Sequence, residues 1–216
     1  EDIEKHGADE LLSSVCGIVV PGGFGPRGVE GMIEAVRYAR EHNVPYLGLC
    51  LGLQVMVIEW ARNVLKIEDA NSEELAPKTE NPVVHIMPEQ EGISSKGGTM
   101  RLGDYPCHPQ SNTLTKQAYG TDVIMERHRH RFELNNSYRE ALENSGLVVG
   151  GLSPDGNLVE TGEVSAHPFM VGTQYHPEFK SRPNRPHPLF SKFIGAAKKT
   201  IREGVQRPLP LDLNSN

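Results

Sequence analysis

The stretch VPYLGLCLGLQ at residues 44–54 decides the fold class. Residues 46–49 form a short apolar run, which is typical of a buried strand, and residues 51–65 repeat apolar side chains at helical spacing. Glycines at positions 48 and 52 flank Cys50 and permit a tight turn between the two elements. The stretch therefore predicts a strand, a sharp turn at Cys50 and a helix.

The same order of elements occurs upstream. Residues 15–20 are apolar and β-branched, and they end at the glycine-rich turn PGGFG of residues 21–25. Residues 29–43 then carry apolar and charged side chains on opposite helical faces. Two successive strand–helix units favour a parallel sheet covered by helices, which is an α/β fold.

The rest of the chain predicts more strands than helices. We expect strands at residues 83–86, 99–102, 122–134, 147–149, 158–160 and 169–175, and helices at residues 137–144 and 188–202. Residues 69–98 are otherwise polar and read as loop. We therefore expect one domain over residues 1–205, followed by a mobile tail over residues 206–216.

Composition excludes several classes of protein. The 216 residues include 22 Lys and Arg against 28 Asp and Glu, and this net charge of −6 argues against nucleic-acid binding. No apolar run approaches the ~18 residues that span a membrane. The three cysteines have no short spacing, so neither a disulfide framework nor a CxxC zinc site is indicated, and we expect a reducing, cytoplasmic environment.

Cys50 lies in a G-x-Cys-x-G pattern between the expected strand and helix. A cysteine at this place is a candidate nucleophile, because the helix N-terminus would stabilise a thiolate and lower the pKa of the thiol. The N–H of Leu51 would face an oxyanion, and the turn at residues 21–25 could supply a second donor. The alternative is a buried structural cysteine. Cys16 is expected in the core and Cys107 in a loop.

His176 and Glu178 follow the expected strand at residues 169–175. A thiol nucleophile needs a base, and an imidazole base needs a carboxylate to fix its tautomer. Residues two apart on a strand face the same way, although Pro177 makes this approximate. The alternative is a turn with a solvated glutamate.

The run ERHRHR at residues 126–131 alternates two residue types. On a strand its arginines share one face and its two histidines the other. Two histidines alone are weak evidence for zinc, and a row of guanidiniums suits a carboxylate or phosphate ligand. A charged edge strand is the alternative. We expect surface or turn positions for the scattered histidines, which are His6, His42, His85, His108, His167 and His187.

Taken together, these motifs resemble the class I glutamine amidotransferases, which share PGGFG, GLCLGLQ and YHPE in this order. The further segments EDANSEEL, GGTMRLG, ERHRHRFE and QYHPEFKSRP are similar to the glutaminase domain of the CTP synthase family. The resemblance covers residues 1–193. It implies a flavodoxin-like, mixed, mostly parallel sheet flanked by helices, here without its first strand–helix–strand unit, so that a sheet edge would be exposed.

The resemblance also implies residue roles. Cys50 is the expected nucleophile, His176 the general base and acid, and Glu178 the residue that orients His176. The other implied roles are oxyanion donation and glutamine binding by Gly23 and Leu51, further glutamine binding by Gln54, Glu74 and Arg131, and a GTP activator region around Arg27 and Glu30. Glu74 suits the ammonium of a free amino acid, and Arg131 suits its carboxylate.

The implied activity is hydrolysis of glutamine to glutamate and ammonia through a glutamyl thioester. In complete family members the ammonia aminates UTP to CTP, with ATP and Mg²⁺ bound by a separate synthetase domain and GTP as activator, in a homo-oligomer. We expect no metal, cofactor, nucleic acid or membrane for this chain itself. Two alternatives stay open: a cysteine hydrolase such as a γ-glutamyl peptidase, and a non-catalytic binding domain of the same fold.

Overall fold

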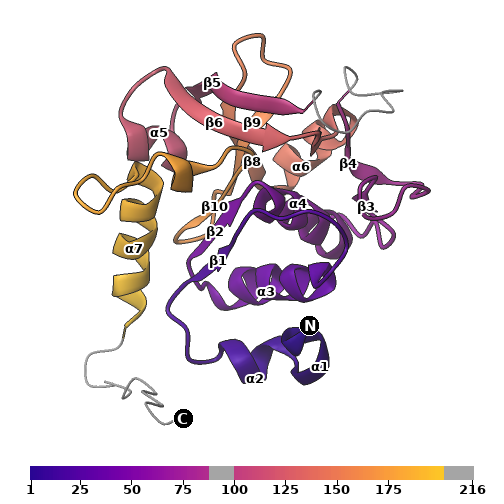
Figure 1. The fold of residues 1–216 in the computed structure, drawn as a ribbon. Helices are drawn as coiled ribbons and strands as arrows, with labels where there is room; N and C mark the ends of the chain where they lie inside the picture. Colours follow the sequence, from indigo (N-terminus) through magenta and orange to yellow (C-terminus); the bar gives the residue numbers. More distant parts are fainter. Residues whose placement is uncertain (88–99, 202–216) are drawn as a thin grey trace, which may run out of the picture.

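A computed structural model describes residues 1–87 and 100–201 (Figure 1). Its main sheet has seven strands in the order β1-β2-β10-β9-β8-β5-β6. These strands are β1 (Ile18–Val20), β2 (Tyr46–Leu49), β5 (Arg101–Pro109), β6 (Ile124–His130), β8 (Leu147–Leu152), β9 (Val159–Val164) and β10 (Met170–Thr173). A second sheet contains β3 (Asn71–Ser72), β4 (Pro82–Ile86) and β7 (Phe132–Leu134) in that order.

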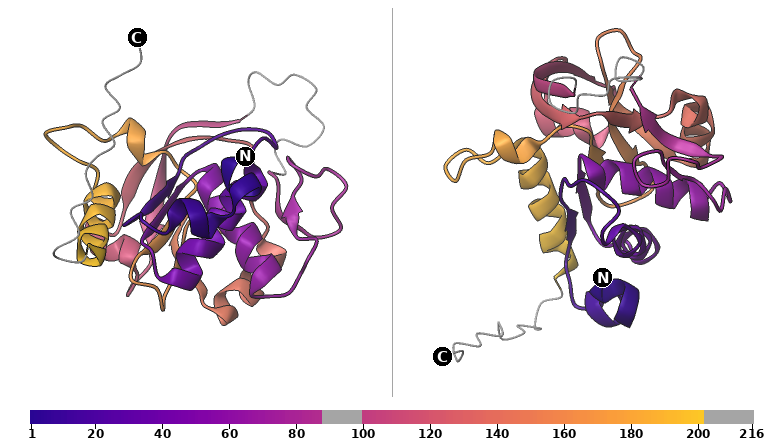
Figure 2. Two further views of the ribbon diagram at one scale, coloured as in Figure 1. Left: turned by 90° about the horizontal axis from the view of Figure 1, so that it is seen from below. Right: turned by 45° about the vertical axis from the view of Figure 1, so that its right-hand side comes forward.

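Helices cover both faces of the first three strands of the main sheet. The α-helices are α1 (Asp2–His6), α2 (Ala8–Leu12), α3 (Val29–His42), α4 (Leu51–Asn63), α5 (Leu114–Tyr119), α6 (Arg139–Ser145) and α7 (Pro188–Thr200). Helices α3 and α4 lie on one face and α7 on the other, as the views in Figure 1 and Figure 2 both show. Within the described ranges, no helix is long and apolar enough to cross a membrane.

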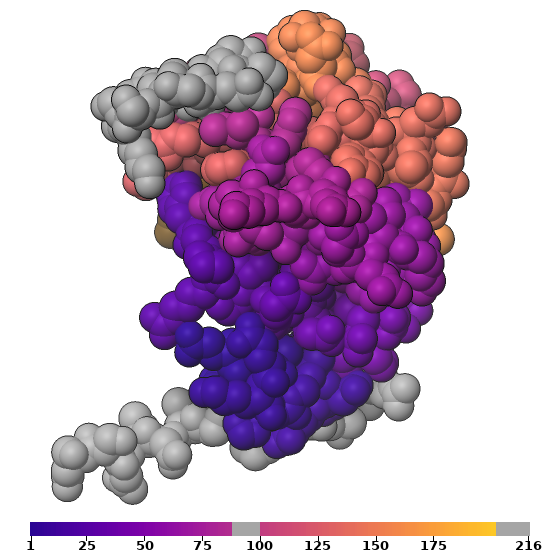
Figure 3. Space-filling model, turned by 90° about the vertical axis from the view of Figure 1, so that its right-hand side faces the viewer, coloured from indigo at the N-terminus to yellow at the C-terminus, as the bar shows by residue number. Residues whose placement is uncertain are grey.

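The sheet is mixed, as expected, but the prediction that it is mostly parallel was wrong, because four of its six strand pairings are antiparallel. Strands β1 and β10 both pair with β2 in parallel, whereas β10–β9, β9–β8, β8–β5 and β5–β6 are antiparallel. Strand β1 is at one end of the strand order. Beside it runs a groove lined in part by Ile3, Val19 and Met32, and Figure 3 shows a hollow in this indigo part of the surface.

Helix α4 packs closely on the sheet because glycines face it. A Cβ on Gly172 would come within 2.8 Å of a Leu53 methyl carbon, and a Cβ on Gly162 within 3.2 Å of the same atom. Leu53 and Met56 are fully buried at this contact. The close approach of helix and sheet fixes the position of the first turn of α4, which follows Cys50 directly.

Several predictions of local structure were wrong. Residues 122–134 form two strands in different sheets, because β6 pairs with β5 whereas β7 pairs with β4. Cys16 lies in a bend before β1 and is partly exposed, and Cys107 is buried within β5. Strand β5 continues through Pro106, whose type argues against a strand, and reaches Pro109 because its last two residues pair with β8.

The short helices α1, α2 and α5 were not predicted, since each has at most six residues and little periodicity to detect. The strand expected at residues 99–102 is seen from Arg101 onward, and residue 99 lies outside the described residues. The proposed tail at residues 206–216 lies outside them as well.

Candidate active site

Cys50 is held in a strained turn between β2 and α4. Its φ of 51° and ψ of −98° lie outside the regions that side-chain-bearing residues ordinarily adopt. Its glycine neighbours make the turn possible. A Cβ on Gly48 would lie 2.5 Å from the carbonyl carbon of Gly52, and a Cβ on Gly52 would overlap the carbonyl oxygen of Val20. The predicted sharp turn is confirmed, and packing explains both glycines.

The thiol of Cys50 is buried and surrounded by polar groups. Gln174 donates its side-chain N–H to Sγ at 3.7 Å, and the backbone N–H of Leu51 also bonds to the sulfur. Burial nevertheless raises the pKa of the thiol to about 12, and the carboxylates of Glu178 and Glu74 contribute in the same direction. The expectation of a lowered pKa was wrong, because the N–H of Leu51 at the start of α4 lowers the pKa by less than burial raises it. A neighbouring base must therefore take the proton.

His176 has the geometry that such a base requires. Strand β10 ends at Thr173, and a 3-10 helix (Pro177–Phe179) turns the carboxylate of Glu178 toward the imidazole. His176 Nδ1 lies 2.6 Å from Glu178 Oε1, whereas Nε2 is buried without a hydrogen-bond partner. Since Nδ1–H donates to the carboxylate, Nε2 carries the lone pair. The pairing was predicted, but a helical turn produces it in place of strand geometry.

The turn at residues 21–23 brings the nucleophile and the base together. A Cβ on Gly22 would lie 2.7 Å from His176 Cε1 and 3.6 Å from Cys50 Cβ, so both side chains approach one point. Gly23 lies beside Leu51, since its Cβ would be 3.1 Å from a Leu51 methyl carbon. The two residues that carry the expected oxyanion donors therefore lie next to each other.

The residues expected to bind glutamine lie around this point. Glu74 Oε1 accepts the backbone N–H of Gly25 at 3.1 Å, which ties it to the PGGFG turn. Gln54 donates to the carbonyl oxygen of Phe132 at 3.0 Å and to Gln174 Oε1 at 3.5 Å. Arg131, directly before Phe132, is half-buried where the chain passes from β6 to β7. Helix α4, which carries Gln54, thus contacts the first residue of β7, which directly follows Arg131.

Arg27 and Glu30 are on the surface at the start of α3. Arg27 is 87% exposed and pairs with Glu1 at 2.7 Å, and Glu30 pairs with Arg62 at 2.9 Å. A GTP activator region around these residues stays a prediction.

The alternation along β6 is confirmed. Its buried side chains are Glu126, His128 and His130, and Arg127 and Arg129 face solvent. Two of the scattered histidines that were expected at surface or turn positions are buried. His167 is buried between the N–H of Phe169 and the carbonyl of Ala39, and His187 is buried against Glu126.

Sequence reasoning missed Gln174, although it precedes His176 by two residues in the same QYHPEF segment. It also missed that the buried face of β6 meets Arg101 of β5 and Glu160 of β9. No local signal reveals these contacts, because strands distant in sequence supply the partners.

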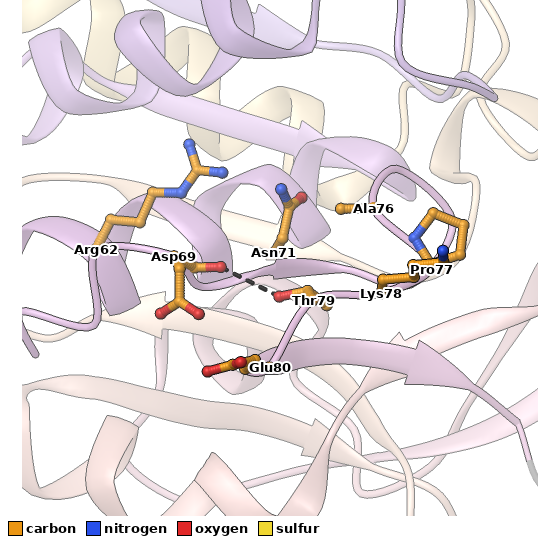
Figure 4. A pocket seen from close by; sticks show the side chains of 8 residues that line it. All are labelled: Arg62, Asp69, Asn71, Ala76, Pro77, Lys78, Thr79 and Glu80. Atoms are coloured by element: carbon orange, nitrogen blue, oxygen red, sulfur yellow. Dashed lines mark hydrogen bonds between the residues drawn. The ribbon is translucent and has the colours of Figure 1, made fainter.

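Two further observations concern sites elsewhere. Among residues 1–87 and 100–201, no group of three or more His, Cys, Asp or Glu side chains could hold a metal ion. A polar surface pocket is lined by Arg62, Asp69, Asn71, Ala76, Pro77, Lys78, Thr79 and Glu80 (Figure 4). It lies at the C-terminal end of α4, about 20 Å from Cys50 at the N-terminal end, given the rise per helical residue.

Comparison with known proteins agrees with this geometry. The family described as "Glutamine amidotransferase class-I" matches residues 2–196. The chain belongs to this family. A CTP synthase of Dehalococcoides mccartyi is 64% identical over 98% of this chain, and one of Roseiflexus castenholzii is 60% identical over 99% of it. The chain spans 39% of the length of each of these two relatives.

A solved structure corresponds to the same part of these enzymes. The glutaminase domain of Trypanosoma brucei CTPS, solved with bound acivicin, superposes with a TM-score of 0.83 at 37% sequence identity. The match covers 97% of this chain and 82% of that domain. The chain thus corresponds to the glutaminase region of CTP synthases, and the expected family and fold class are confirmed.

Proposed function

We propose that this class I glutamine amidotransferase domain hydrolyses the side-chain amide of L-glutamine to glutamate and ammonia through a glutamyl thioester on Cys50. One observation carries the proposal. A buried imidazole, oriented by a carboxylate at 2.6 Å, has its second nitrogen unpartnered beside a buried thiol at a strained turn. Such an arrangement suits nucleophilic catalysis by cysteine.

The reaction follows from these positions. His176 Nε2 takes the proton of Cys50, and the sulfur attacks the amide carbon of glutamine. The N–H groups of Gly23 and Leu51 receive the oxyanion. His176 then donates the proton to the departing nitrogen, which leaves as ammonia, and the thioester forms. Water, deprotonated by His176, attacks the thioester to release glutamate and restore the thiol.

Free glutamine would be recognised by its charged groups. Glu74 would pair with the ammonium and Arg131 with the carboxylate, while Gln54 is held between Phe132 and Gln174 by its two hydrogen bonds. A γ-glutamyl peptide carries the same free ammonium and carboxylate on its glutamyl residue, so a panel of glutamine and γ-glutamyl peptides distinguishes the two substrates.

The ammonia would be used by a synthetase domain such as the rest of a CTP synthase contains. There it would aminate UTP that ATP has phosphorylated, with Mg²⁺ bound by that domain, GTP as activator and a homo-oligomer as the complete assembly. Similarity to CTP synthases over 98% of this chain supports this assignment. The reaction also suits a reducing compartment such as the cytoplasm, because Cys50 must stay a thiol.

The first experiment labels the nucleophile. The chain is incubated with a glutamine-mimicking electrophile, and the labelled peptide is identified by mass spectrometry. We expect label on Cys50, with glutamine hydrolysis lowered on the order of 10⁴-fold or more in Cys50→Ala. Cys107→Ala is the matched control, because Cys107 is also buried but lies in β5. Label elsewhere, or none on a folded chain, would refute the proposal.

The second experiment compares two arginines of one run. Arg131→Ala should raise the glutamine concentration for half-maximal hydrolysis by at least about tenfold, since a charge-assisted pair to the substrate carboxylate is lost. Arg129→Ala should change it far less, because Arg129 faces outward over the ring of Phe24 at 5.8 Å. Equal effects would show that Arg131 is not the carboxylate ligand.

A further inference from the structure

A buried line of polar side chains runs behind the site. Arg101 holds Glu160 by two bonds of 2.6 and 3.0 Å. His128 Nε2 lies 3.6 Å from Glu160 Oε2, and His128 Nδ1 lies 3.0 Å from His130 Nε2. His130 Nδ1 lies 3.0 Å from the carbonyl oxygen of Phe132. The line therefore begins on β5 and β9, crosses the inner face of β6 and ends at the first residue of β7.

The hydrogen bonds in this line have one direction. The carbonyl of Phe132 can only accept, so His130 Nδ1 carries a proton and donates it. A neutral His130 must then accept at Nε2, and His128 Nδ1–H is the donor. Both rings are neutral, because burial lowers the pKa of His130 to about 3 and lowers that of His128 further, with Arg101 adding to both shifts. The two tautomers are thus fixed by their contacts.

The end of the line touches the glutamine-binding residues. The carbonyl that His130 holds also accepts the N–H of Gln54 at 3.0 Å. Arg131 lies between His130 and Phe132, and its own carbonyl accepts the N–H of Met87 at 2.9 Å. The backbone around Arg131 is therefore held from two sides, at the point where the chain leaves the large sheet for the small one.

From this arrangement we propose that His130, supported by His128, is a positioning residue for glutamine recognition. By holding the carbonyl of Phe132, His130 sets the backbone from which Arg131 extends and the amide orientation of Gln54. The proposal rests on the proposed function, in which these two side chains meet the substrate. Small displacements of a positioning group weaken recognition strongly, so a single hydrogen bond to this backbone has a measurable effect.

Packing alone does not account for two histidines here. The line leaves His128 Nε2 buried without a hydrogen-bond partner, opposite the carboxylate of Glu160. A buried unsatisfied polar atom costs about 1–3 kcal/mol, which an apolar pair of similar size would avoid. The His130 bond to Phe132 is the contact that an apolar pair would lose.

The test exploits two amides that imitate different ring nitrogens. His130→Asn places an amide near the position of Nδ1 and can still donate to the Phe132 carbonyl. His130→Gln places its amide near Nε2 and keeps a partner for His128 but loses the bond to Phe132. Cys50 labelling by a glutamine-mimicking electrophile is measured over a range of concentrations, and labelling by iodoacetamide reports the thiol without glutamine recognition.

We expect His130→Gln to raise the half-saturating concentration of the glutamine mimic about tenfold, as the loss of a hydrogen bond near 1.4 kcal/mol would do. For His130→Asn, the half-saturating concentration of the mimic should stay within about threefold of that of the unchanged chain. Neither should alter the maximal labelling rate or the iodoacetamide rate. Equal half-saturation in the two variants would overturn the proposal.

Controls separate the possible failures. His167→Asn changes a histidine of similar burial that contacts Ala39 and Phe169, and it should leave half-saturation unchanged; a rise equal to that of His130→Gln would overturn the proposal. Arg131→Ala must weaken binding of the glutamine mimic. If it does not, the proposed glutamine site is wrong, and the result does not bear on His130 itself. If His130→Gln does not fold, His128→Asn is compared with His128→Leu, which lacks the donor to His130. Equal half-saturating concentrations of the mimic in His128→Asn and His128→Leu would also overturn the proposal.

Discussion

The parallel and antiparallel parts of the main sheet differ in what they bury. Strands β1, β2 and β10 are short and apolar, and the PGG turn, Cys50 and His176 lie where these strands end. The strands β9, β8, β5 and β6 instead bury charged and titratable groups, which are Arg101, Glu126, His128, His130, Glu160 and Glu163. One part holds the reacting groups, and the other lies behind the residues expected to recognise the substrate.

The two parts are therefore held in place by different forces. In the parallel part, close backbone contacts at Gly48 and Gly52 force the turn at Cys50 into one conformation. In the antiparallel part, directional bonds between side chains position the backbone around Arg131. The parallel part should be sensitive to added volume, and the antiparallel part to lost polar partners.

The largest effect is expected from Arg101→Met in the antiparallel part. This change leaves Glu160 buried without its partner, and removal of one member of a buried pair costs about 3–5 kcal/mol. The double variant Arg101→Met with Glu160→Leu removes both charges. Its free energy of unfolding should fall clearly less than that of Arg101→Met alone. Urea denaturation measures both free energies of unfolding. A double variant no more stable than Arg101→Met would show that the pair is not the main stabilising contact.

A somewhat smaller effect is expected from Gly52→Ala in the parallel part. The new methyl group would overlap the carbonyl of Val20, so we expect a loss of about 3 kcal/mol in the free energy of unfolding, together with slower Cys50 labelling. Gly195→Ala in α7 is the matched control, because no atom lies within 4 Å of its added Cβ. The free energy of unfolding of that control should rise by about 0.5–1 kcal/mol, because alanine favours a helix more than glycine does. A Gly52→Ala chain with unchanged stability and labelling would contradict the packing explanation of the turn.

The last effect, about 1.4 kcal/mol for each pH unit, is a change in the pH dependence of the free energy of unfolding. The folded-state pKa of His130 is about 3, below its unfolded value near 6.5, so the unfolded chain binds more protons between these values. The contribution of neutral, buried His130 to the free energy of unfolding is complete above pH ~6.5 and is lost as pH falls toward 3. The free energy of unfolding should therefore fall on acidification by about 1.4 kcal/mol per pH unit from His130.

His130→Asn tests this contribution, because both chains keep His128, whose pKa burial lowers, and Glu160 and Glu163, whose pKa values burial raises. Denaturant melts between pH 4 and 6.5 should show a shallower slope for the variant, by about one proton. Parallel slopes would mean that His130 is protonated in the folded chain.

The sequence predicted those features that depend on neighbours along the chain. Alternation through residues 126–131 separated the arginines from the histidines, and the glycines around Cys50 predicted its turn. His176 and Glu178 were paired because they are close in sequence. The prediction of one strand over residues 122–134 was wrong because the alternation continues past His130 while the pairing partner changes from β5 to β4.

What the sequence determined by itself is the order of elements and the chemical type of each candidate residue, since periodicity, glycine spacing and motif are local properties. Only the tertiary structure decided the environment of those residues. Burial raised the pKa of Cys50 against the hydrogen bonds from Leu51 and Gln174, and strands far apart in sequence joined Arg101, Glu160 and the two histidines of β6. Desolvation and contact depend on distance in space, which a local pattern does not contain.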